Sequence, residues 1–103
     1  EPLEGVLPKG AVPRAVEVEK RAVVRCAEAK LARDPTSAEK TTVQFVVEPN
    51  GRVTTASIEE PAPKDQRYAQ CLISVVKSLR LPRPRGGRAL VKSPFIVTGN
   101  PTH

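Results

Sequence analysis

The chain has 103 residues, 39% of them hydrophobic and only three aromatic, so it is long enough for one domain with a thin core of Val, Leu, Ile and Ala. Lys and Arg outnumber Asp and Glu by 17 to 11, and this basic surplus suits acidic partners such as nucleic acid, anionic lipid or an acidic protein surface. No apolar run approaches the ~18 residues of a membrane span and no signal-peptide pattern is present, so we expect any export signal or anchor to lie upstream of Glu1.

The first third of the chain predicts an arm followed by a helix. Residues 1–12 are rich in Pro and Gly and lack periodicity, which is typical of a linker or N-terminal arm. A helical pattern starts at Pro13, where a missing N–H costs nothing, and ends at Asp34, because a residue before proline avoids the α region. Residues 15–19 alternate and are also compatible with a short strand. The charged residues, Lys30 among them, are expected to point away from the apolar face. That face carries Val16, Val23, Cys26, Ala27 and Leu31.

The middle of the chain predicts a β-hairpin. Residues 40–48 have a period of two, which indicates a strand with one apolar face. Asn50-Gly51 follows, and this pair favours a tight turn because both residues tolerate positive φ. The return strand is expected at residues 52–59, where the apolar positions lose strict parity and predict a bulge or strong twist. The apolar face of the first strand carries Val43, Phe45 and Val47.

The last third predicts a helix, a basic loop and a final strand. The helix is expected from about Asp65, whose side chain can cap it, to Leu79. Four arginines and two prolines predict a stiff basic loop over residues 80–88, and residues 99–103 form a tail. The apolar face of the helix carries Tyr68, Cys71, Leu72, Val75, Val76 and Leu79. The final strand, residues 89–97, presents Val91, Phe95 and Val97 on one face.

These elements predict an α+β domain over residues 13–98, in the order α-β-β-α-β. The simplest arrangement is a three-stranded antiparallel sheet with spatial order 2-1-3 and both helices packed on one face. The last strand is then an edge, in agreement with Pro94, because prolines in sheets occur at edges and bulges.

The chain contains two cysteines, Cys26 and Cys71, each on the apolar stripe of a predicted helix. We expect them to form a disulfide, which would close a loop of about 45 residues and stabilise the fold by roughly 4 kcal/mol. The alternative is a pair of inert buried thiols.

Several short motifs occur together between about Val12 and Val97. They are Cys26-Ala27-Glu28, the run Val43 to Val47 leading into Asn50-Gly51-Arg52-Val53, Cys71, Leu81-Pro82, Gly86-Gly87 and Pro94-Phe95-Ile96-Val97. In order and spacing they resemble the C-terminal domain of the TonB superfamily, and most closely its AgmX/PglI branch from myxobacterial gliding motility. The chain departs from that branch in having Ala27 in place of an aromatic residue and Leu81 in place of Phe.

The resemblance implies a periplasmic domain of an energy or force transducer. Such a domain is tethered to the inner membrane by a segment outside this chain, and it reaches an outer-membrane or periplasmic protein partner. The resemblance implies transport or motility as the process.

No catalytic or metal-binding pattern is present, so we do not expect an enzyme. The only histidine is His103, the last residue, which leaves no Ser–His or Cys–His pair to activate a nucleophile. Cys26, Cys71 and His103 lack the spacing of a zinc site. We therefore predict no catalytic residue, no metal and no cofactor.

The predicted function is binding by β-strand addition, in which an extended peptide completes the ladder of an edge strand. Arg85, Arg88 and Lys92 are expected to steer an acidic peptide, whereas Pro94 donates no hydrogen bond and limits the ladder. The candidate edge residues are Arg88, Leu90, Val91, Lys92, Ser93, Phe95, Ile96 and Val97, and the basic loop contributes Arg80, Arg83 and Arg85.

Two alternatives remain open at this point. One is a passive scaffold or dimerisation domain of a motility or secretion complex, including a homodimer. The other is a nucleic-acid-binding module centred on residues 80–88, which the absence of interleaved aromatic stacking platforms disfavours.

Overall fold

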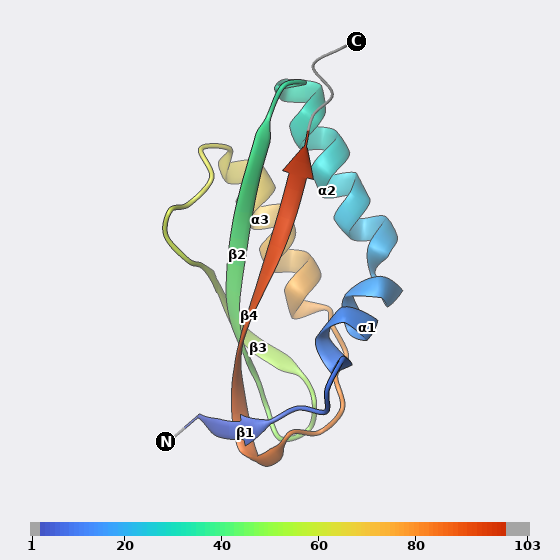
Figure 1. Cartoon of the computed structure of the whole chain (residues 1–103), viewed down its shortest axis with the longest axis vertical. Helices are drawn as coiled ribbons and strands as arrows, with labels where there is room; N and C mark the ends of the chain where they lie inside the picture. The colour runs from blue at the N-terminus through green and yellow to red at the C-terminus, as the bar shows by residue number, and fades with distance from the viewer. Residues whose placement is uncertain (1–2, 99–103) are drawn as a thin grey trace.

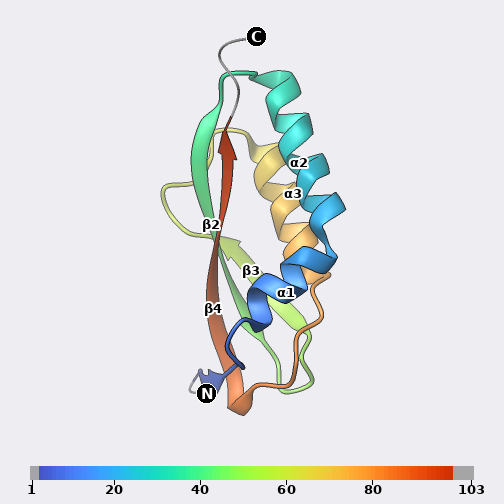
Figure 2. The same cartoon turned by 45° about the vertical axis from the view of Figure 1, so that its right-hand side comes forward.

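The computed structural model describes residues 3–98, so the tail predicted at 99–103 and His103 lie outside the described residues. The elements run β1, α1, α2, β2, β3, α3 and β4 along the chain (Figure 1). Their bounds are Glu4–Val6, Ala11–Val18, Lys20–Arg33, Ala38–Val47, Val53–Ile58, Gln66–Lys77 and Arg85–Thr98, respectively. The helices all lie on one face of the sheet, which confirms the predicted α+β class (Figure 2).

The predicted count of three strands and two helices is wrong. The first helix begins at Ala11, two residues earlier than expected, and it is divided into α1 and α2 at Glu19. Residues 15–18 are helical, so the alternative strand there does not form. The segment expected as an arm contains β1, a fourth strand that pairs with β4. The segment packs against the domain because the side chain of Leu7 is half-buried against the core.

Gly5 makes the pairing of β1 with β4 possible. A Cβ atom at this position would collide with the carbonyl oxygens of Gly87 and Arg88, so only glycine lets the two backbones approach so closely. The pairing is antiparallel and short, with Glu4 opposite Ala89 and a register shift before Val6.

The four strands are ordered β1-β4-β2-β3, with β2 antiparallel to both of its neighbours as predicted. The β2–β4 ladder is continuous over ten pairs, from Ala38 opposite Thr98 to Val47 opposite Ala89. The β2–β3 ladder shifts register just before Val47, in agreement with the irregularity, a bulge or strong twist, predicted for the return strand.

The helices are joined to each other and to the sheet through one core. Cys26 on α2 and Cys71 on α3 form the predicted disulfide, with their Cα atoms 5.8 Å apart. The sheet face beneath the helices carries the predicted apolar residues. They are Val43, Phe45 and Val47 on β2 and Phe95 and Val97 on β4.

Lys30 is the clearest error in the predicted helix face, because only 4% of it is exposed. It lies four residues after Cys26 and therefore shares the buried face of α2. Its Nζ is 2.7 Å from Glu39 Oε1 on β2, and the two groups form an ion pair without the alignment of a hydrogen bond. The same Nζ lies 5.1 Å from the centre of the Tyr68 ring. Burial, together with the Glu39 carboxylate, raises the pKa of Tyr68 to about 12.

Candidate partner-binding edge

The outer edge of β4 is covered only near its start. The strand begins at Arg85 rather than Ala89, and β1 pairs with β4 over residues 85–89, so the prediction of an open edge is wrong for Arg88 and for the start of the predicted strand at Ala89. From Leu90 to Thr98 the described chain supplies a neighbour on one side only, which is β2. The open edge is therefore nine residues long.

The hydrogen-bond pattern shows which backbone groups of β4 face outward. Glu59 N–H donates to Thr42 O at 2.9 Å, so even-numbered residues of β2 bond to the β3 side and odd-numbered ones to β4. Because Val43 pairs with Ser93, the odd-numbered residues of β4 bond to β2. The even-numbered residues of β4 then direct their backbone groups to the open edge. Pro94 is one of them, so the outward row of donors is interrupted in its middle.

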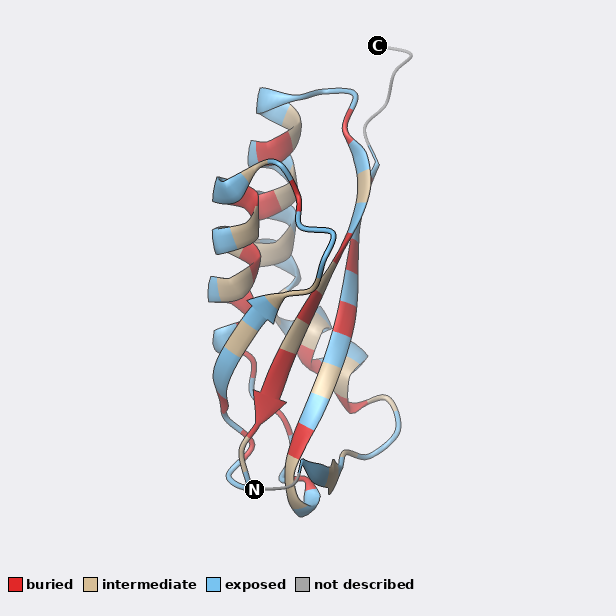
Figure 3. Cartoon of the chain, turned by 90° about the vertical axis from the view of Figure 1, so that its left-hand side faces the viewer, coloured by how far each residue is buried: buried red, intermediate tan, exposed pale blue. Residues whose placement is uncertain are grey.

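The predicted edge residues divide between the two faces of the sheet, as the alternating burial along β4 shows (Figure 3). Val91, Ser93, Phe95 and Val97 face the helices and are buried or half-buried. Arg88, Leu90, Lys92 and Ile96 lie on the opposite face, where Ile96 is 71% exposed. Of this second set, Leu90, Lys92 and Ile96 present their side chains to solvent beside the open edge, whereas Arg88 lies in the part of β4 that β1 covers.

Two of the three cations expected to steer a partner already have carboxylate partners. Arg88 Nε is 3.1 Å from Glu48 Oε1, and Lys92 Nζ is 2.9 Å from Glu59 Oε1. The Thr54 hydroxyl and the Arg88 guanidinium lower the pKa of Glu48. The third cation, Arg85, is opposite Val6 in the covered part of the strand. Attraction of an acidic peptide by these three side chains is therefore weaker than their sequence positions indicate.

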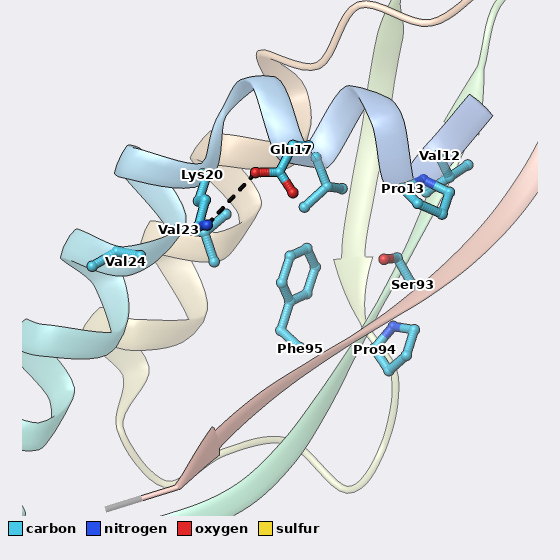
Figure 4. A pocket seen from close by; sticks show the side chains of 10 residues that line it. Val12, Pro13, Glu17, Lys20, Val23, Val24, Ser93, Pro94 and Phe95 are labelled. Atoms are coloured by element: carbon cyan, nitrogen blue, oxygen red, sulfur yellow. Dashed lines mark ion pairs between the residues drawn. The ribbon is translucent and has the colours of Figure 1, made fainter. Parts of the chain in front are cut away.

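A groove that the sequence did not reveal runs along the helix side of the open edge. It measures about 440 Å³ and lies between β4 and the α1–α2 segment, with Phe95 projecting into it (Figure 4). Glu17 and Lys20 form an ion pair of 3.7 Å beside it. The available signal was Val24, an apolar residue on the predicted helix outside its assigned face, together with Val12 just before the predicted helix start. The lining residues are Val12, Pro13, Val16, Glu17, Lys20, Val23, Val24, Ser93, Pro94 and Phe95.

The three arginines of the predicted basic loop are not part of the open edge. Arg80 and Arg83 lie in the segment between α3 and β4, and Arg85 is the first residue of β4. This segment passes the β1 end of the sheet, whereas the open edge extends toward the other end (Figure 1).

Asp65 caps α3, as predicted, and it also links α3 to α2 through Arg33. Its Oδ1 accepts from the Tyr68 N–H at 3.1 Å, and its Oδ2 accepts from Arg33 Nε at 2.8 Å. The Arg33 hydrogen bond is the main cause that lowers the pKa of Asp65 below its ordinary value of 3.8, with the Tyr68 amide adding to it.

Asp65→Asn is expected to reduce stability at neutral pH and to have a smaller effect in acid. A carboxylate whose pKa is depressed in the folded state stabilises fully above its unfolded pKa, and this contribution disappears as the pH falls through the folded value. Urea unfolding at pH 7 and at several values below about 4 measures the change. Glu28→Gln, at an exposed position on α2, controls for the loss of a negative charge. A destabilisation by Asp65→Asn that stays constant with pH would contradict the assignment.

Metal-binding clusters and membrane-spanning helices are both absent from residues 3–98. No group of three or more His, Cys, Asp or Glu side chains there is placed to hold a metal ion. Across the same residues, every helix is too short or too polar to cross a membrane. Comparison with protein-family models, with curated proteins and with solved structures finds no match.

Proposed function

We propose that this chain is a periplasmic protein-interaction domain that captures an extended segment of an outer-membrane or periplasmic partner by strand addition along residues 90–98. The observation that carries the proposal is an open backbone edge lying beside an apolar groove. The edge offers main-chain hydrogen bonds and the groove offers a place for side chains.

The groove gives the added strand a preferred side-chain pattern. Side chains alternate between the two faces of a sheet, so every second side chain of an added strand faces the helices. Those opposite Ser93 and Phe95 would enter the groove, where Val16 and Val23 form part of the opposite wall. The intervening side chains would lie on the outer face near Lys92 and are free to be polar. The proposed ligand is thus an extended peptide with large apolar residues at every second position.

Pro94 weakens this ladder without abolishing it. It removes one outward donor, but its carbonyl oxygen still faces the open edge and accepts. Lys92 and Ile96 keep both of their outward groups on either side of it. One missing backbone hydrogen bond costs about 1 kcal/mol, which burial of a single apolar side chain in the groove offsets.

The cellular setting is a second part of the proposal. A disulfide between α2 and α3 suits an oxidising compartment. The sequence motifs resemble the TonB C-terminal domains, which supports a place in an envelope-spanning energy or force transducer. Several backbone hydrogen bonds loaded together also suit a domain that is pulled.

The proposal is tested by nuclear magnetic resonance with a labelled domain and an extended peptide of alternating leucine and threonine, with aspartate at both ends. We expect chemical-shift changes along residues 90–98 and at the groove wall, including Val16 and Val23. Changes confined to α3 would show that the peptide binds elsewhere, and the proposal would be abandoned. Concentration-dependent changes at the edge without peptide would instead indicate a homodimer formed through β4.

Two valines on the helices give a matched pair for the groove. Val24 lines the groove, whereas Val18 is 80% exposed and does not. Val24→Ser is expected to weaken peptide binding about fivefold, because the apolar contact of one valine is worth about 1 kcal/mol. Val18→Ser is expected to leave the dissociation constant unchanged in the same titration. Equal effects of the two substitutions would show that the groove takes no part.

A further inference from the structure

One end of the molecule carries most of the basic surplus. The chain from Lys77 to Arg88 contains five basic residues and no acidic one, and the β2–β3 turn adds a sixth. We define the basic end as Arg52, Lys77, Arg80, Arg83 and Arg85. Within residues 3–98 none of these five forms an ion pair. The described carboxylates at this end are Glu4 and Glu48, and Glu48 is bound to Arg88.

The basic end is assembled from separate parts of the chain. Arg52 and Arg80 are paired in an isolated antiparallel bridge, which sets two like charges opposite each other. Like charges in this arrangement repel, so an anion bound between them would be stabilising. Both residues and Lys77 line a surface hollow of about 420 Å³. A positive concavity of this kind favours phosphate oxygens.

Two of these cations, Arg83 and Arg85, have an exposed apolar neighbour on β1. Val6 on β1 is 65% exposed, and Leu3 just before the strand is 40% exposed. Val6 lines a second hollow, of about 320 Å³, together with Leu7, Pro8, Arg83 and Arg85. Arginines and aliphatic side chains thus face the same space.

We propose that the basic end binds the surface of an anionic phospholipid membrane. The arginines contact lipid phosphates while Val6 enters the boundary of the acyl chains, as in interfacial anchors that combine cations with apolar groups. Nucleic acid fits this end less well. Contacts to the phosphates of a nucleic acid would leave the exposed Val6 without a role. The three aromatic residues that could stack on bases, Phe45, Tyr68 and Phe95, are all buried.

This membrane contact is independent of strand addition. The molecule is elongated, 48 × 24 × 18 Å, and β1, which carries Val6 of the hollow shared with Arg83 and Arg85, lies at one extremity of its long axis (Figures 1 and 2). The open edge runs from Leu90 toward the opposite extremity. A domain standing on a membrane by its basic end therefore keeps residues 90–98 accessible to a partner.

Vesicle co-sedimentation tests the proposal. We expect the domain to bind vesicles of about 30% phosphatidylglycerol in phosphatidylcholine at about 0.1 M salt, and not vesicles of phosphatidylcholine alone. Each basic residue near the membrane surface raises the binding affinity about fivefold, so the double substitution Arg83→Ser with Arg85→Ser should weaken vesicle binding about twenty-fivefold. The matched control is Arg21→Ser with Arg25→Ser, which removes the same charge from exposed positions on α2 and should have a much smaller effect. Val6→Ser should weaken binding about fivefold.

Three results would overturn the proposal. The first is an equal loss of vesicle binding in the Arg21, Arg25 control, which would show that only the net charge of the domain attracts it to the membrane. The second is wild-type binding by Val6→Ser, which would show that no apolar side chain enters the membrane. The third is that the domain binds duplex DNA or a polyaspartate peptide more tightly than it binds the vesicles, and that the Arg83, Arg85 variant loses this tighter binding. That result would assign the basic end to a nucleic acid or to an acidic protein.

Discussion

Replacing both cysteines, Cys26→Ser with Cys71→Ser, is expected to lower the free energy of unfolding by about 4 kcal/mol. The disulfide joins residues separated by 45 positions, and closing a loop of that length restricts the unfolded chain by about this amount. A domain of this size has a total stability of about 5–15 kcal/mol, so the loss is a large part of it. Urea unfolding of the oxidised wild type and the double variant measures the difference.

A reductant separates loss of the bond from damage caused by the new serines. Dithiothreitol should lower the stability of the wild type to near that of the double variant, and it should leave the double variant unchanged. Two reactive thiols in unreduced, denatured wild-type protein would show that the bond is absent. The two long helices would then be held together by core packing and the Arg33–Asp65 ion pair.

Elements whose residues pack locally could be predicted from the sequence. The β2–β3 hairpin follows from alternation around Asn50-Gly51, and the bulge follows from lost parity in the return strand. Helix α3 has a regular apolar stripe and an aspartate cap, so its limits were close to those observed. The disulfide was predictable because both cysteines are on apolar helix faces that cover one side of one sheet.

Features that depend on contacts distant in sequence were missed. β1 has no strand periodicity in its three residues, and it forms because Gly5 fits against Gly87 and Leu7 reaches the core. Lys30 was assigned to solvent by its charge, but the packing of α2 on β2 places Glu39 and Tyr68 around it.

The sequence predicted the strand that carries the candidate site, but it did not predict which part of that strand is open or which side chains surround it. The position of β4 beside β2 followed from topology, whereas its partial cover by β1 did not. The groove exists only because Val12 and Val24 on the helices lie across from Phe95, which follows them by 83 and 71 residues in the chain. The counter-ions of Arg88 and Lys92 come from distant parts of the chain, Glu48 just after β2 and Glu59 just after β3, so sequence reasoning took both cations to be available.

Two substitutions on the open edge are expected to change peptide binding in opposite directions. Pro94→Thr supplies the missing outward N–H and should tighten binding of the leucine–threonine peptide about fivefold, the value of one backbone hydrogen bond. Ile96→Pro removes a second outward donor next to the first gap and should weaken binding at least tenfold. Neither position bonds to β2, so both variants should keep the β2–β4 ladder. Titration calorimetry gives the dissociation constants and circular dichroism checks the fold.

The internal control for this pair is Ser93→Pro, one residue from Pro94 on the same strand. Ser93 pairs with Val43 and directs its N–H into the sheet, so proline there should unfold or strongly destabilise the domain. Stability unaffected by Ser93→Pro, together with unfolding by Ile96→Pro, would mean that the even-numbered residues face inward. Pro94 would then leave the outward ladder intact. Unchanged affinity in both Pro94→Thr and Ile96→Pro, with the fold retained, would show that the peptide does not use the backbone of this edge, and strand addition would be rejected.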